Sequence, residues 1–251
     1  FPRLAERTHH MGVTLSGGLC ADGGDFGKTL VLRDGRPATR SVTALGLYGA
    51  SLRIGCGSLG GWDPFGPERV ITRADGNVLH ELDGRSALDL YKQYLGPHAE
   101  GLPATALLFP LSVRDPRRPD EAPIVRTVLG VDDEANTMTF AGEMPTGAFA
   151  RLMKANFDRL IDGALGAATA ATTPLSRAGT ELALLISCVG RRLVLKQRAE
   201  EEVEAARDAL GEGAALCGFY SYGEISPFTP DARCELHNQT MTVTALSETD
   251  A

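Results

Sequence analysis

Three short polar segments border apolar runs of the chain, and their side chains could bind a small ligand. The first contains Ser187, Cys188 and Arg191 and follows the continuous apolar run 182–186. Such a run predicts a strand covered on both faces, and ligands in layered α/β sheets bind where such strands end. A helix that begins there offers unpaired N–H groups. Arg191 adds a fixed positive charge, so we expect a carboxylate or another small anion to bind.

Cys188 in this segment has two interpretations. As a small apolar residue it would simply fill the end of the strand. As a ligand contact it would use its polarisable sulfur, or a thiol whose pKa is lowered by the helix start and by Arg191. A cysteine phosphatase would need a longer phosphate-binding loop between the cysteine and the arginine than the two residues found here, so we exclude that class of enzyme.

The second segment, residues 218–225, places Glu224 beside Tyr220 and Tyr222 at the end of an expected strand. An acidic side chain there could bind an ammonium group, and Tyr220 could contact the same ligand. The alternative is structural: Gly223 makes a turn, and Glu224 accepts hydrogen bonds from nearby backbone N–H groups. The sequence leaves both interpretations open.

The third segment carries four consecutive hydrogen-bonding side chains, from His237 to Thr240. Such a run is unusual unless the side chains order a buried loop or contact a ligand. His237 and Asn238 are therefore predicted ligand contacts. The alternative for His237 is a structural histidine that is bonded within the fold.

No pattern in the chain supports catalysis. There is no Ser/His/Asp ordering, nucleophile elbow or phosphate-binding loop, so we expect a protein that is not an enzyme. A thiol-dependent hydrolase would require Cys188 and His237 in hydrogen-bond contact. The adjacent His9 and His10 have no third ligand nearby, so no metal site is predicted.

Three helices are expected to position these segments. The first begins after Ser86, a predicted N-cap, and ends at Gly96. The second carries apolar residues at three-and-four spacing over residues 157–168. The third spans residues 195–210, with the glutamates 200–202 on its solvated surface.

Strands are expected on both sides of the first helix. Before it, residues 29–32 and 42–48 predict a meander, and residues 69–73 and 77–81 predict a hairpin. After it, the predicted order of elements is α-β-β-β-α-β-α-β-β. This order indicates an α+β fold in which mixed, largely antiparallel sheets are flanked by helices. The strands after the first helix are expected within residues 104–113, 124–131, 138–140, 182–186, 214–222 and 241–246.

Composition restricts the partners of the chain. It has 251 residues, of which 43% are hydrophobic, and a net charge of −7 without any basic cluster, so nucleic acid is not an expected partner. No apolar run approaches the roughly 20 residues needed to span a bilayer, which predicts a soluble, cytoplasmic protein without a membrane segment. The five cysteines are widely spaced and lack a C-x-x-C pair, as expected for reduced thiols.

The polar segments also resemble a known family. Residues 184–191, 218–225 and 235–242 are similar to the C-terminal part of FIST proteins, named for F-box and intracellular signal transduction. Residues 17–48 resemble the end of the family's N-terminal region. With a Gly/Pro-rich stretch at 57–67 taken as a linker, three regions are predicted. These are the end of a FIST N-like region (1–60), a connecting hairpin region (61–85) and a FIST C-like domain (86–251).

The resemblance implies a sensory domain without catalytic residues. FIST domains occur alone or beside histidine kinases, cyclic-di-GMP enzymes and chemotaxis receptors, and small ligands such as amino acids are proposed for them. Some bacterial members bind haem and sense nitric oxide, so haem is the main alternative ligand, with His237 as the first candidate for its axial ligand. A third possibility is an interaction scaffold without a ligand. The first part of the family's N-terminal region is expected to be missing from the sequence.

Overall fold

The computed structural model describes residues 12–175, 179–228 and 233–249. His9 and His10 lie outside them. The chain forms two compact units, one of residues 1–60, 161–236 and 240–251 and the other of residues 61–160 and 237–239. Because each unit is assembled from separate stretches of chain, the three consecutive regions expected from the sequence stay a prediction.

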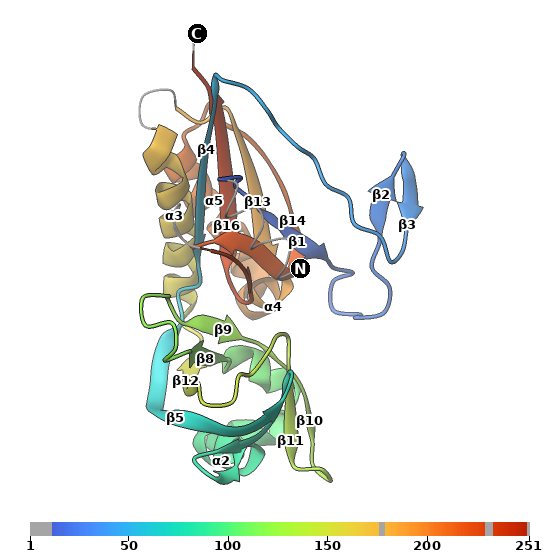
Figure 1. Ribbon diagram of the computed structural model, residues 1–251, viewed down its shortest axis with the longest axis vertical. Coiled ribbons are helices and arrows are strands. Elements are labelled where there is room, and N and C mark those ends of the chain that lie inside the picture. Colours follow the sequence, from blue (N-terminus) through green and yellow to red (C-terminus); the bar gives the residue numbers. More distant parts are fainter. Residues whose placement is uncertain (1–11, 176–178, 229–232, 250–251) are drawn as a thin grey trace. The chain divides into compact units, whose positions relative to one another are not determined.

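The first unit is built on a sheet in the order β1-β14-β13-β16-β4 (Figure 1). β13 runs parallel to β14, whereas the pairs β1–β14, β13–β16 and β16–β4 are antiparallel. β15 adds a further pairing to β14. The strands are β1 (Gly17–Cys20), β4 (Leu52–Leu59), β13 (Leu182–Cys188), β14 (Ala215–Pro227), β15 (Cys234–His237) and β16 (Met241–Glu248).

Helices cover one face of this sheet. Alanines of α3 (Phe157–Thr172) and Ala206 and Leu210 of α5 (Ala199–Leu210) share an apolar core with the inward residues of β13 and β16. The predicted third helix is wrong in its first turn. Val189–Leu195 forms a separate helix, α4, and the 3₁₀ turn Lys196–Arg198 divides it from α5.

The second unit holds a sheet in the order β10-β11-β6-β5-β12-β8-β9. Helix α2 (Ala87–Leu95) contributes its buried side chains to the apolar core of this unit. The Ser86 side chain accepts a bond from the Asp89 N–H at 3.1 Å, which confirms the predicted N-cap. The strands are β5 (Asp63–Asp75), β6 (Val78–Leu82), β7 (Arg85–Ser86), β8 (Leu111–Arg114), β9 (Ile124–Arg126), β10 (Val128–Asp132), β11 (Thr137–Phe140) and β12 (Phe149–Lys154).

The α+β class is confirmed, but several strands differ from the prediction. Residues 104–108 form a 3₁₀ helix before β8 instead of the start of a strand. The supposed linker 57–67 contributes to β4 and β5. β12 was not predicted, although it pairs with both β5 and β8. Apolar character alone does not distinguish a buried strand from a short helical turn.

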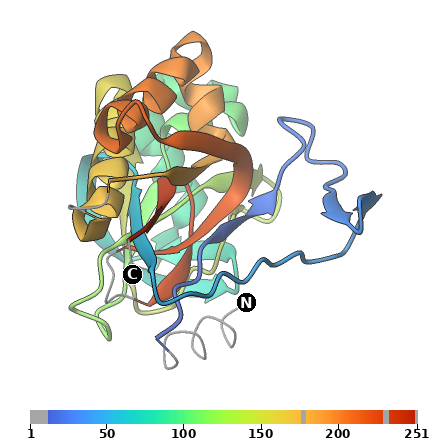
Figure 2. The same cartoon turned by 90° about the horizontal axis from the view of Figure 1, so that it is seen from above.

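The predicted meander before residue 50 is wrong in its second strand. A short hairpin of β2 (Val31–Arg33) and β3 (Arg36–Ala38) forms instead, and residues 42–48 have no strand partner. Val42, Leu45 and Tyr48 are 91%, 85% and 94% exposed. Figures 1 and 2 show this hairpin standing away from the sheet of its own unit. Residues 42–48 thus pair with no strand of the described chain, despite their alternating pattern.

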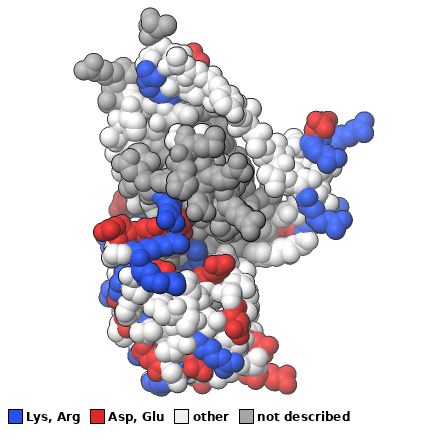
Figure 3. All heavy atoms as spheres, viewed as in Figure 1, with Lys and Arg blue, Asp and Glu red and all other residues white. Residues whose placement is uncertain are grey.

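Charged side chains of both signs share the molecular surface. On the face drawn in Figure 3, Lys and Arg are interspersed with Asp and Glu. Among the described residues, no helix is long and apolar enough to cross a membrane.

Candidate functional site

A buried ionic group lies between the sheet of the first unit and α5. Arg191 and Glu202 are both fully buried, and the Arg191 Nε–H donates to Glu202 Oε2 at 2.9 Å. The Ser187 hydroxyl donates to the other oxygen of Glu202 at 2.9 Å. A second guanidinium nitrogen of Arg191 donates to the Gly60 carbonyl. Arg191, predicted as an anion contact, therefore already holds an anion supplied by the fold.

Glu202 corrects the sequence analysis, which placed residues 200–202 on the solvated surface. Glu202 precedes the buried residues Ala206 and Leu210 by four and eight positions, so it lies on the same face of α5. That spacing was the signal for its burial. Its charge instead indicated exposure to solvent, because glutamate is almost never fully buried unless it is paired.

Tyr220 belongs to this helix-facing group. It lies opposite Ser187 in the register of β13 and β14. Burial, together with the negative charge of Glu202, raises the pKa of Tyr220 to about 12. The Arg192 guanidinium carbon lies 5.0 Å from the centre of the tyrosine ring, within cation–π range. The phenol therefore stays protonated near neutral pH.

Glu224 forms a second buried group. It is fully buried, and its carboxyl group accepts hydrogen bonds from the Ser221 hydroxyl and from the Thr240 hydroxyl, the latter at 2.9 Å. The Thr240 backbone N–H lies 3.3 Å from the same carboxyl oxygen that the Thr240 hydroxyl contacts. Glu224 makes no ion pair with a Lys or Arg of the described chain. Its hydrogen-bond donors in the described chain are therefore neutral, although the positive charge of Arg191 also favours the ionised carboxylate.

Cys188 lies at the edge of the Glu224 group. It is buried, stands opposite Ser221 in the β13–β14 register, and donates its backbone N–H to the Thr240 carbonyl at 3.1 Å. Successive residues of a strand point to opposite faces of the sheet. The side chain of Ser187 contacts α5, so that of Cys188 points to the other face. The structure thus divides the predicted residues of this unit into two groups.

His237 and Asn238 belong to the second compact unit. Both are buried, and the Asn238 side-chain amide donates to the His237 carbonyl at 3.0 Å. The carbonyl of Gln239 accepts a 3.0 Å bond from the indole N–H of Trp62. Because His237 is only 1% exposed, a haem group could reach it only if this segment opened. Ligand contacts by His237 and Asn238 stay predictions.

Sequence reasoning missed two partners of the site, Ser221 and Thr240. Both stood in the polar segments, but nothing in the sequence paired them with Glu224. Thr240 lies 16 residues from Glu224, and Ser221 precedes it on the same strand. Thr240 directly precedes β16, which β13 separates from β14 in the sheet, so the contact follows from the order of the strands, which a single sequence does not specify.

Glu224 predicts a pH dependence of stability. Burial raises its pKa from 4.5 to about 7, against the hydrogen bonds of Ser221 and Thr240. The folded chain therefore binds more protons than the unfolded chain between these values. The contribution of Glu224 to the free energy of unfolding is complete below about pH 4.5. It falls as pH rises to about 7 and then levels off, a loss on the order of 3 kcal/mol.

The measurement is urea unfolding of the wild type and of Glu224→Gln from pH 4.5 to 8. The difference in unfolding free energy cancels the other titrating groups. We expect it to shift in favour of the variant as pH rises. A difference that stays constant over this range would contradict a raised pKa for Glu224.

Family models match nearly the whole chain. The FIST N domain matches residues 3–85, and the FIST C domain matches residues 87–227, more than half of the sequence. The chain belongs to the FIST family. FIST domains are sensory domains of signal transduction, which places this chain in that broad class.

Curated relatives of this FIST chain include an uncharacterized protein of Mycobacterium tuberculosis, 28% identical over 86% of the chain and 57% of the relative. An uncharacterized protein of Mycobacterium bovis is 26% identical over 91% of the chain and 59% of the relative. An uncharacterized protein of Methanocaldococcus jannaschii is 26% identical over 59% of the chain. The chain therefore spans less than two thirds of the length of these relatives. No solved structure matches it.

The described part of this FIST chain also bears on metal and redox chemistry. Within the described ranges, no three His, Cys, Asp or Glu side chains are grouped so that they could hold a metal ion. The five cysteines form no disulfide in the described part of the chain. Burial raises the pKa of Cys56, and it raises that of Cys234 to about 12, so these two thiols are poor nucleophiles at neutral pH.

Proposed function

We propose that this FIST chain senses a small polar metabolite carrying an ammonium group, such as an amino acid, and that Glu224 binds the ammonium group. The observation that carries the proposal is a fully buried carboxyl group held by hydroxyl and N–H donors, without an ion pair in the described chain. A buried carboxylate is costly unless a cation accompanies it. A ligand ammonium would supply that cation.

The same chemistry couples binding to protonation. Near neutral pH, Glu224 is divided between its acid and carboxylate forms, because its pKa lies at about 7. An ammonium ion favours the carboxylate and releases a proton. Binding should therefore weaken below pH 7. It should strengthen above pH 7, until the pH is high enough for the ligand amine to lose its own proton.

The structure changes the expected partner of the ligand carboxylate. Arg191 was predicted for this role, but Glu202 already matches its charge. An amino-acid carboxylate would have to replace Glu202 or use other donors. Cys188 belongs to the Glu224 group and remains a proposed contact of this ligand. Ser187 and Tyr220 belong to the α5-facing group, and His237 and Asn238 to the second unit, so their ligand contacts stay predictions from the sequence. The proposal depends on Glu224 alone.

The test is thermal unfolding of the purified chain at pH 8 against a panel of amino acids. Each amino acid is paired with its N-acetyl derivative, which keeps the side chain and carboxylate but lacks the ammonium group. A ligand at 100 times its Kd stabilises the folded state by about 2.7 kcal/mol. We expect stabilisation by at least one free amino acid, none by its acetylated partner, and none for Glu224→Gln.

Two results would oppose the proposal. One is a panel in which no amino acid raises the melting temperature. The other is equal stabilisation of the wild type and Glu224→Gln, which would place the ligand elsewhere. A Soret band after haem addition that is lost in His237→Ala would instead favour the haem alternative.

Output partners such as histidine kinases or cyclic-di-GMP enzymes remain part of the proposal. This part of the proposal rests on the sensory class of the family.

A further inference from the structure

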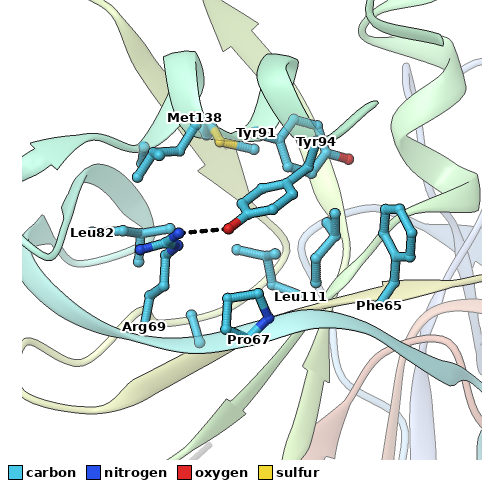
Figure 4. A pocket seen from close by; sticks show the side chains of 12 residues that line it. Phe65, Pro67, Arg69, Leu82, Tyr91, Tyr94, Leu111 and Met138 are labelled. Atoms are coloured by element: carbon cyan, nitrogen blue, oxygen red, sulfur yellow. Dashed lines mark hydrogen bonds between the residues drawn. The ribbon is translucent and has the colours of Figure 1, made fainter. Parts of the chain in front are cut away.

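The second unit contains a small, largely apolar pocket under helix α2 (Figure 4). Its volume is about 20 Å³. Tyr94 of α2 and Phe65 of β5 line it together with Leu111 of β8 and Met138 of β11. Arg69 of β5 is the one charged residue lining the pocket in the described chain. An apolar cavity with a single cation suits a ligand of matching character.

The guanidinium group of Arg69 is bonded to Asp83 on one side and lacks one hydrogen-bond acceptor on the other. Its Nη1 donates to Asp83 Oδ2 at 2.9 Å, and its Nη2 donates to the Tyr94 hydroxyl at 2.5 Å. Figure 4 shows the Tyr94 hydroxyl directed at the guanidinium group. The Arg69 Nε–H is buried and has no acceptor among the described residues. Asp83 thus fixes the guanidinium while the edge formed by Nε and Nη2 carries only one of its two bonds.

That edge has the spacing to donate two parallel hydrogen bonds to a carboxylate. The Tyr94 hydroxyl is a single oxygen and fills only the Nη2 position. Tyr94 is half-buried on the last turn of α2, so its ring can turn toward solvent more readily than a core residue. A carboxylate that replaced the hydroxyl would satisfy Nη2 and Nε together.

We propose that this pocket binds a small apolar carboxylate, with both oxygens on the Nε–Nη2 edge of Arg69 and the hydrocarbon part against Phe65, Leu111 and Met138. The present volume holds only the end of such a ligand, so larger acids require Tyr94 to turn outward. The apolar lining favours an acid with a hydrocarbon group over inorganic phosphate or acetate. The site is independent of Glu224, which belongs to the other unit.

The pocket also joins the two family regions. Phe65, Arg69 and Leu82 lie in the stretch that matches the FIST N domain, whereas Tyr94, Leu111 and Met138 lie in the FIST C match. All of them belong to one compact unit. A ligand here would therefore contact both regions without any assumption about how the two units are arranged.

The test uses the methionine methyl groups as probes. The chain is labelled with carbon-13 at the methionine methyls, and Met138→Leu assigns the pocket signal. Butyrate, isovalerate and benzoate are titrated, with benzamide as the uncharged match for benzoate and acetate as the match for charge alone. Met241, in the other unit, serves as the internal control. We expect saturable shifts of Met138 with dissociation constants on the order of millimolar or tighter, and no shift of Met241.

Two variants test the role of Arg69. Arg69→Met should weaken carboxylate binding at least about 10-fold, because it removes a charged, bidentate donor. Tyr94→Phe keeps the ring but removes the competing hydroxyl, so it should strengthen binding about 3- to 10-fold by making Nη2 available. A tyrosine with a purely structural role would not produce tighter binding.

Three results would overturn the proposal. The first is a Met138 signal that no apolar carboxylate moves in the folded wild type. The second is benzamide binding as well as benzoate, which would exclude charge recognition. The third is unchanged or weaker binding in Tyr94→Phe, a measurement that remains valid even if Arg69→Met does not fold. None of these results depends on whether amino acids bind at Glu224.

Discussion

Glu202→Gln is expected to destabilise the chain by about 3–5 kcal/mol, the range for removing one partner of a buried ion pair. The substitution keeps the shape of the side chain and can keep a hydrogen bond to Ser187 or to Arg191. It removes the negative charge that matches Arg191, whose side chain is fully buried. The guanidinium would then remain in the interior without a carboxylate at the position of Glu202.

Urea unfolding followed by far-ultraviolet circular dichroism measures this loss. Trp62, the only tryptophan, belongs to the second unit, and its fluorescence shows whether that unit unfolds separately. The matched control is Glu204→Gln, two residues along the same helix and exposed. We expect the control to change stability by less than about 0.5 kcal/mol.

The double variant Arg191→Met with Glu202→Leu distinguishes the loss of the whole ion pair from the loss of one partner. Replacing both members with apolar residues of similar size is often neutral or stabilising. We expect it to recover most of the stability that Glu202→Gln loses. A loss below about 1 kcal/mol for Glu202→Gln alone would show that water reaches the pair, against the burial seen in the structure.

The ion pair illustrates what the sequence could predict and what it could not. The strand before Ser187, the helix after it and the burial of this region all follow from local patterns. The carboxylate that matches Arg191 lies 11 residues away on another helix. A local pattern identifies a cation near a strand end, but it does not show whether the fold or a ligand supplies the anion.

The same distinction applies to the secondary structure. The Ser86 cap and the Gly96 end of α2 are local signals, and both are confirmed. β12 is recognisable only through its pairing with β5 and β8, which are distant in sequence. The strand expected at residues 42–48 has the right alternation but no neighbour to bond, and alternation alone does not make a strand.

Gly57 is the clearest case in which a local signal misleads, because glycine is typical both of linkers and of close packing. It was assigned to a linker, yet it lies within β4, which runs alongside α3 in Figure 1. A Cβ atom at Gly57 would lie 2.1 Å from the Ala167 carbonyl oxygen, and one at Gly55 would lie 1.8 Å from that of Ala171. The backbone of β4 therefore rests directly on the backbone of α3.

Gly57→Ala should consequently destabilise the first unit by more than about 3 kcal/mol, beyond ordinary overpacking, because helix backbone cannot move aside as a side chain can. Gly17→Ala in β1 is the control, since its added Cβ meets nothing within 4 Å. Both substitutions place alanine in a strand of the same sheet, so any difference reports the contact with α3. If Gly57→Ala unfolds at the same urea concentration as Gly17→Ala, β4 and α3 are not in this contact.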